Sequence, residues 1–138
     1  TGHEKVLEVG TGSGYQTVLL SHLAGQVFSI ERVPELLERA REVITACGVG
    51  NVSLMLGDGT LGWTAYAPYD AILISAAAPD IPRPLLEQLA EGGRMIIPLG
   101  DRDEQMLVMV TRRDNRIERR DITPVRFVPL VGTHGWSG

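Results

Sequence analysis

The sequence predicts a doubly wound α/β fold whose sheet is mostly parallel and closes with antiparallel C-terminal strands. Short apolar strands alternate with amphipathic helices over the first hundred residues, which is the pattern of parallel strands joined by crossover helices. The first of these strands runs into alternate glycines and then into a helix. The last third of the chain instead shows successive strands joined by a polar turn, which indicates antiparallel pairing.

Four strands and two helices are expected in the first 75 residues. Each strand is a short run rich in apolar residues, and the last is apolar at nearly every position, as a central parallel strand should be. Each helix carries apolar residues at helical spacing and ends at a glycine, Gly25 or Gly48, and Pro34 stands in the first turn of the second helix. In chain order, we expect a strand over 5–9, a helix over 15–24, a strand over 26–30, a helix over 34–47 and strands over 51–56 and 70–75.

The rest of the chain is expected to form one helix and four strands. The helix ends at Gly92 and Gly93, and a polar turn at Asp114 and Asn115 joins two antiparallel strands. With 138 residues, 43% of them hydrophobic, the chain can bury one core, so we expect a single domain over residues 1–138. These elements are a helix over 82–90 and strands over 94–98, 105–111, 117–124 and 125–130.

The composition limits the kinds of molecule that we expect the protein to bind. The chain has 13 basic and 17 acidic residues, and its net charge of −4 argues against broad attraction to nucleic acid or to an anionic membrane. The arginines over 112–120 are interleaved with acids, which indicates a solvated hairpin. The single Cys47 excludes an internal disulfide and fits a reducing cytoplasm, and the three scattered histidines lack metal-ligand spacing.

The glycine-rich turn over residues 10–14 predicts a site for a polar or anionic ligand. Because the turn follows a strand and precedes a helix, backbone N–H groups and the positive end of the helix dipole face the ligand. A dinucleotide site is disfavoured, since Tyr15 stands where the Gly-x-Gly-x-x-Gly pattern needs its third glycine. Gly-x-Gly-x-Gly with Glu8 two residues before it resembles the first motif of class I S-adenosylmethionine-dependent methyltransferases.

Two carboxylates at the ends of the following strands indicate an adenosine-containing ligand. Glu31 lies 21 residues after Gly10, at the end of the second strand, where it can accept hydrogen bonds from both ribose hydroxyls. Its alternative role is to cap the next helix. Asp58 follows the third strand and can accept a hydrogen bond from the exocyclic amine of adenine, although Asp-Gly is also a common turn.

Nearly the whole chain resembles the protein-L-isoaspartate O-methyltransferase family. The resemblance implies a Rossmann-like methyltransferase fold and methyl transfer from S-adenosylmethionine to the free carboxylate of isoaspartyl residues in damaged proteins. Because that carboxylate is ionised at neutral pH, it needs no general base, and alignment of donor and acceptor is the main catalytic task. The matching segments include residues 10–16, 30–32, 57–60, 62–63, 67–70, 76–79, 86–89, 92–94 and 127–130.

The resemblance also implies roles for individual residues. The small side chains of the alanine loop would leave backbone groups free to meet an extended peptide, and the segment over 128–133 would close over substrate and cofactor. The cofactor-binding residues implied are Glu8, Gly10, Thr11, Gly12, Gly14, Glu31, Arg32, Asp58 and Gly59, and the substrate-binding ones are Ala76, Ala77, Ala78, Pro79, Val128 and Leu130.

The resemblance assigns no catalytic residue within this sequence. Family members carry helices with a substrate-facing Ser/Thr region before the first strand, whereas this sequence starts at Thr1, just before that strand. We therefore expect the family's hydroxyl residue to lie upstream of Thr1. Loss of those helices predicts impaired activity and self-association through uncovered apolar surface.

Two other interpretations stay open. The expected loss of the N-terminal helices favours a protein that binds S-adenosylmethionine without activity. A methyltransferase with a small-molecule acceptor would use the same cofactor motifs. Methylation of adenine in nucleic acid is disfavoured, because residues 75–78, Ser-Ala-Ala-Ala, replace the Asn-Pro-Pro-Tyr-type loop that grips a flipped base.

Overall fold

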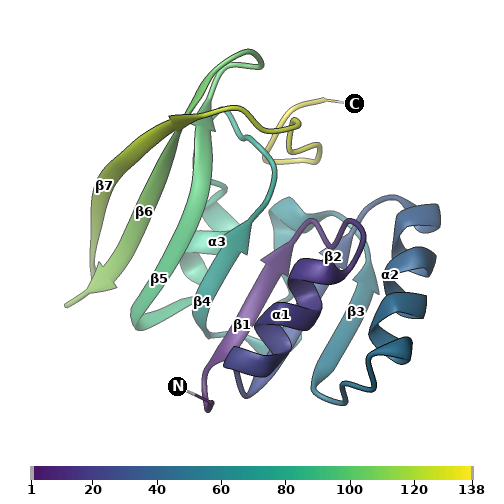
Figure 1. Ribbon diagram of the computed structural model, residues 1–138. Helices are drawn as coiled ribbons and strands as arrows, with labels where there is room; N and C mark the ends of the chain where they lie inside the picture. The colour runs from purple at the N-terminus through teal and green to yellow at the C-terminus, as the bar shows by residue number, and fades with distance from the viewer. Residues whose placement is uncertain (1, 138) are drawn as a thin grey trace.

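The computed structural model describes residues 2–137, which form one seven-stranded sheet in the order β3-β2-β1-β4-β5-β6-β7. The first five strands are parallel, and β6 and β7 continue the sheet as an antiparallel meander (Figure 1). The strand order reverses between β1 and β4, which confirms the doubly wound prediction. The strands are β1 (Lys5–Val9), β2 (Gln26–Glu31), β3 (Val52–Leu56), β4 (Tyr69–Ile74), β5 (Leu89–Gly100), β6 (Gln105–Arg113) and β7 (Arg116–Val125).

Helices cover parts of both faces of the sheet. In Figure 1, α1 (Tyr15–Leu23) lies in front of β1 and β2, α2 (Pro34–Ala46) lies to the right of β3, and α3 (Arg83–Glu87) lies behind the sheet. Two 3-10 turns, η1 (Gly59–Leu61) and η2 (Thr64–Tyr66), connect β3 to β4. No helix among residues 2–137 is long and apolar enough to cross a membrane.

Gly14 lets α1 and α2 pack closely together. Its φ of +88° is one that L side chains rarely adopt, and a Cβ atom at this position would lie 2.9 Å from the Cα atom of Ala40 on α2. The third glycine of the turn therefore serves helix packing as well as the turn itself.

The core lies on both faces of the central strands. Leu7, Ile72 and Met95 come from β1, β4 and β5 and are completely buried. Full burial of such a side chain contributes about 1.5–3 kcal/mol. On β1, residues 6–9 are all buried, so the first strand is covered on both sides and fixed where it leads into the glycine turn.

Helix α1 exposes an apolar stripe. Tyr15, Leu19 and Leu23 recur at every fourth residue and are 68%, 60% and 63% exposed. Self-association through this stripe stays a prediction.

The helix expected over 82–90 is shorter than predicted. It spans only Arg83–Glu87, and β5 begins at Leu89, before the two glycines that were expected to end the helix. The N–H of Tyr69 donates to the carbonyl of Gln88 (2.8 Å), so the chain joins the sheet at once. The side chain of Arg112 donates to the carbonyls of Leu86, in the last turn of the helix, and Leu89, the first residue of β5.

Residues 125–130, all of them described, do not form the predicted strand. β7 ends at Val125, and the following loop crosses the chain after β4, where the Ala77 N–H donates to the Val128 carbonyl and the Leu130 N–H donates to the Ala77 carbonyl, both at 2.7 Å. Pro129 has no N–H for a sheet ladder. The C-terminal segment therefore lies beyond the upper ends of the parallel strands in Figure 1.

Candidate active site

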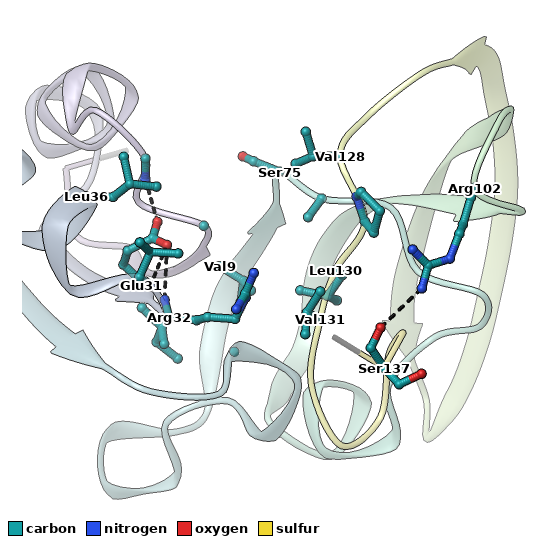
Figure 2. Close-up of a pocket in the computed structure, with 17 residues that line it drawn as sticks. Val9, Glu31, Arg32, Leu36, Ser75, Arg102, Val128, Leu130, Val131 and Ser137 are labelled. Atoms are coloured by element: carbon teal, nitrogen blue, oxygen red, sulfur yellow. Dashed lines mark hydrogen bonds between the residues drawn. The ribbon is translucent and has the colours of Figure 1, made fainter.

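A cavity of about 510 Å³ opens at the carboxyl ends of β1, β2 and β4, where the strand order reverses. Figure 2 shows Glu31, Arg32 and Leu36 on one side of this cavity and Leu130, Val131, Arg102 and Ser137 on the other. The volume is in the range of small-molecule sites. The lining residues are Val9, Gly10, Gly12, Ile30, Glu31, Arg32, Val33, Leu36, Gly59, Ser75, Ala76, Arg102, Val128, Pro129, Leu130, Val131 and Ser137.

The glycine turn forms part of the first wall. The N–H groups of Gly10 and Thr11 donate to the carbonyl of Ile30, at 2.9 and 3.3 Å, and fasten the turn to β2. Gly10 and Gly12 have φ values of +98° and +56° and line the cavity, which lets the backbone approach a ligand. Thr11 is buried and its hydroxyl pairs with that of Ser29 at 2.6 Å, so Thr11 supports the turn from behind.

Glu31 holds the end of β2 and lines the cavity at the same time. Its Oε1 accepts a hydrogen bond from the Gly12 N–H (2.8 Å), and its Oε2 accepts from the N–H groups of Arg32 and Val33, each at 3.1 Å. Hydrogen bonds to a charged group contribute about 1.5–3 kcal/mol each. Val33 is the N-cap position of α2, where no side chain caps the helix, so Glu31 holds the residues that lead into α2 while it lines the cavity.

Glu8 lies beneath the glycine turn and does not line the cavity. Its carboxylate is completely buried and accepts hydrogen bonds from Thr17, Ser29 and Gln16. Burial raises the pKa of the Glu8 carboxyl group, although these three hydrogen bonds act in the opposite direction. The geometry therefore gives Glu8 a supporting position that joins β1, α1 and β2.

The carboxylate of Asp58 is hydrogen-bonded to the C-terminal turn, residues 131–137. Its Oδ1 accepts from the N–H (2.9 Å) and hydroxyl (2.6 Å) of Thr60, and its Oδ2 accepts from the Thr133 N–H (2.9 Å). Burial raises the pKa of Asp58, but the hydrogen bonds from Thr133 and Thr60 outweigh it and hold the pKa below its ordinary value. Of the Asp58-Gly59 pair, Gly59 lines the cavity and Asp58 anchors the turn.

The alanine loop after β4 is less available than the sequence suggested. Ala77 bonds to Val128 and Leu130 through its backbone, and the Ala78 N–H and carbonyl bond to Pro98 and Gly100. The expectation of free backbone groups is therefore wrong for both alanines. The lining comes from Ser75 and Ala76 of this loop, while Pro79 is exposed outside the cavity.

The expected position of the family's hydroxyl residue falls outside the part of the chain that the structure describes. That residue was expected upstream of Thr1, and Thr1 itself lies outside the described residues. The position of this hydroxyl upstream of Thr1 stays a prediction. Within residues 2–137, the two walls line the cavity.

The second wall brings in a residue that sequence reasoning missed. Arg102 lies between β5 and β6, where its guanidinium stacks on Trp136, 4.9 Å from the ring centroid, and donates to the Ser137 carbonyl at 3.2 Å. Val128 and Leu130, predicted at the acceptor end, line the same wall. Arg102 stands in a charged loop outside the matching segments, so no pattern distinguished it from a solvated side chain.

Comparisons with known proteins agree with this geometry. The family model described as Protein-L-isoaspartate(D-aspartate) O-methyltransferase (PCMT) matches residues 1–135. The chain is 53% identical over 136 residues to the protein-L-isoaspartate O-methyltransferase of Dictyoglomus thermophilum, covering 99% of this chain and 62% of that protein. It is 54% identical over 140 residues to the protein of the same name from Syntrophus aciditrophicus, covering 99% of this chain and 64% of that protein.

Solved structures show the same relationship. A protein-L-isoaspartate O-methyltransferase superposes with a TM-score of 0.87 at 28% identity, covering 96% of this chain and 43% of that one. The beta-aspartate methyltransferase (PCMT) of Plasmodium falciparum, in complex with S-adenosyl-L-homocysteine, gives a TM-score of 0.78 at 26% identity, covering 93% and 66%. The chain thus spans less than two thirds of the length of the curated relatives named above. With a family model matched over nearly all its residues, this chain belongs to the protein-L-isoaspartate O-methyltransferase family.

Proposed function

We propose that this chain binds S-adenosylmethionine in the cavity and directs its methyl group to the free carboxylate of isoaspartyl residues in proteins. The observation that carries the proposal is the position of Glu31, whose carboxylate lines the cavity beside an open glycine turn at the reversal of strand order. The names of the relatives support the choice of reaction.

The first wall suits the nucleoside part of this cofactor. A Cβ atom at Gly12 would meet nothing within 4 Å, so the backbone there is open to a ligand. Glu31 can accept hydrogen bonds from ribose hydroxyls, and Val33 and Leu36 offer apolar contacts for a base. When bound, S-adenosylmethionine supplies a methyl group activated by a sulfonium.

The second wall suits the acceptor. Ala76 and Leu130 are buried, and Val128 is 69% exposed at the mouth of the cavity, so this wall can exclude water while admitting a peptide. Because the acceptor carboxylate is already ionised, the chain's own residues need only hold and orient it. Small side chains next to Ser75 leave room for that approach.

Calorimetry with S-adenosyl-L-homocysteine tests the cofactor site. We expect Glu31→Gln to weaken binding roughly 10- to 100-fold, since the loss of a charged hydrogen bond costs about 1.5–3 kcal/mol. Glu35→Gln is the matched control, because Glu35 is an exposed glutamate in the first turn of α2. Failure of the unmodified chain to bind this nucleoside would refute the proposal.

Methyl transfer tests the acceptor. We expect labelled methyl groups to pass to an isoaspartyl peptide and not to the same peptide with ordinary aspartate. Nucleoside binding without transfer to either peptide would identify a binding protein, and transfer only to small carboxylic acids would identify a different acceptor class. A cytoplasmic location forms part of the proposal and rests on the single Cys47.

A further inference from the structure

The cavity carries guanidinium groups on opposite walls. Arg32 follows Glu31 on the β2 side, whereas Arg102 stands across from it with Leu130, Val131 and Ser137 (Figure 2). The connection that carries Arg102 is tied to the acceptor loop, since the Gly100 N–H donates to the Ala78 carbonyl at 3.0 Å. Arg102 is thus the cation on the acceptor side.

Arg102 is oriented but not neutralised. Its guanidinium stacks on Trp136, and one nitrogen, Nη2, donates to the Ser137 carbonyl. A guanidinium carries five N–H donors in one plane, so this contact leaves donors free. Among residues 2–137, no carboxylate forms a salt bridge with Arg102, and the neighbouring Asp101 accepts instead from the N–H groups of Asp103 and Glu104.

The other residues that line the second wall carry no positive charge that could bind an anion. Its other lining residues are apolar or carry a hydroxyl, as Val128, Leu130 and Ser137 do. Arg102 is therefore the charged group that this wall offers an anionic acceptor, whereas Arg32 lies on the nucleoside side of the cavity. A stacked, pre-oriented fork suits a carboxylate because it can bind both oxygens with little further ordering.

We propose that Arg102 determines specificity for an anionic acceptor by pairing with the isoaspartyl carboxylate before transfer. This inference rests on the proposed function. In the reaction, a carboxylate oxygen forms a bond to the methyl carbon, the carbon–sulfur bond breaks, and its electron pair stays on sulfur. No proton moves. The ester and the thioether are both neutral, so the pair with Arg102 exists for the substrate and is absent for the product.

This change in charge dictates the kinetic signature. The pair stabilises the bound substrate and weakens as the carboxylate loses its charge, so it lowers KM without raising kcat. We expect Arg102→Gln to raise KM for an isoaspartyl peptide about tenfold, with kcat unchanged or slightly higher. Arg102→Lys should recover part of the affinity, because lysine keeps the charge but lacks the fork. Arg113→Gln, an exposed arginine outside the cavity, is the matched control.

Two further measurements separate this role from a merely structural one. Added salt should raise KM for the unmodified chain and Arg113→Gln, and much less for Arg102→Gln. The affinity for S-adenosyl-L-homocysteine should stay within about twofold in all variants. An Arg102→Gln variant with unchanged KM and unchanged salt dependence would overturn the proposal, as would a general loss of nucleoside binding that Arg102→Lys fails to restore.

Equilibrium binding tests the role of Arg102 if the chain shows no catalytic turnover. With S-adenosyl-L-homocysteine present, the unmodified chain should bind the isoaspartyl peptide more tightly than its methyl ester, whereas Arg102→Gln should bind the two equally. No binding of the peptide, or an unchanged preference in the variant, would overturn the role of Arg102. Absence of turnover with the preference intact would count against the proposed reaction alone.

Discussion

Replacing Gly132 with alanine tests how the C-terminal turn is held over the cavity. A Cβ atom on Gly132 would lie 2.1 Å from Oδ1 of Asp58 and 2.8 Å from Cγ2 of Thr60. Both distances are shorter than real Cβ contacts, so either the turn or the Asp58 side chain must move. The backbone at Gly132 is outside the left-handed region, so the effect of the substitution is steric.

The cost follows from the hydrogen bonds that the turn would lose. The Thr133 N–H donates to the Asp58 carboxylate at 2.9 Å, and the His134 N–H donates to the Thr60 hydroxyl at 3.1 Å. A bond to a charged group and a neutral bond together contribute about 2–4 kcal/mol. Opening of the turn should then become roughly 30- to 700-fold more frequent.

Amide hydrogen exchange over residues 131–137 measures this opening directly. Exchange should accelerate in Gly132→Ala, and affinity for the isoaspartyl peptide should fall, because Val131 and Ser137 line the second wall of the cavity. Gly50→Ala is the control, since a Cβ atom there would meet nothing within 4 Å and its φ is not left-handed. If the turn exchanges equally slowly in both variants, the anchoring role assigned to Asp58 is wrong.

Three other substitutions test the support of the site. The raised pKa of Glu8 means that the folded state binds the carboxyl proton more tightly than the unfolded chain does, so the free energy of unfolding should fall as pH rises above the ordinary pKa of 4.5. Urea unfolding of Glu8→Gln should show a smaller fall over the same pH range. An unchanged dependence of the unfolding free energy on pH would contradict this. Gly59→Ala would place a Cβ atom 2.3 Å from Cγ1 of Val9, and we expect a loss of about 1–3 kcal/mol with weaker nucleoside binding, measured by thermal unfolding and calorimetry. Ile72→Ala should cost about 2–5 kcal/mol in denaturant unfolding, because the side chain is completely buried at the centre of the sheet; a loss below about 1 kcal/mol would contradict the packing.

Elements with local causes were predictable, and elements with distant partners were not. The first four strands and first two helices follow from apolar periodicity, Pro34 and the helix-ending glycines, which act within a few residues. The start of β5 depends on pairing with Tyr69, and the loop after β7 depends on hydrogen bonds with Ala77. Nothing in the sequence near β5 or near the loop after β7 identifies these distant partners.

The candidate site likewise combines features with local causes and features that depend on distant partners. The sequence alone determined that the glycine turn and Glu31 face one cavity, because both follow neighbouring parallel strands whose carboxyl ends meet at one edge of the sheet. Only the tertiary structure decided that Glu8 lies beneath the turn, that Asp58 anchors residue 133, and that Arg102 reaches the second wall. Those positions depend on which distant segment packs against each side chain, and a linear pattern of residue types does not specify such contacts.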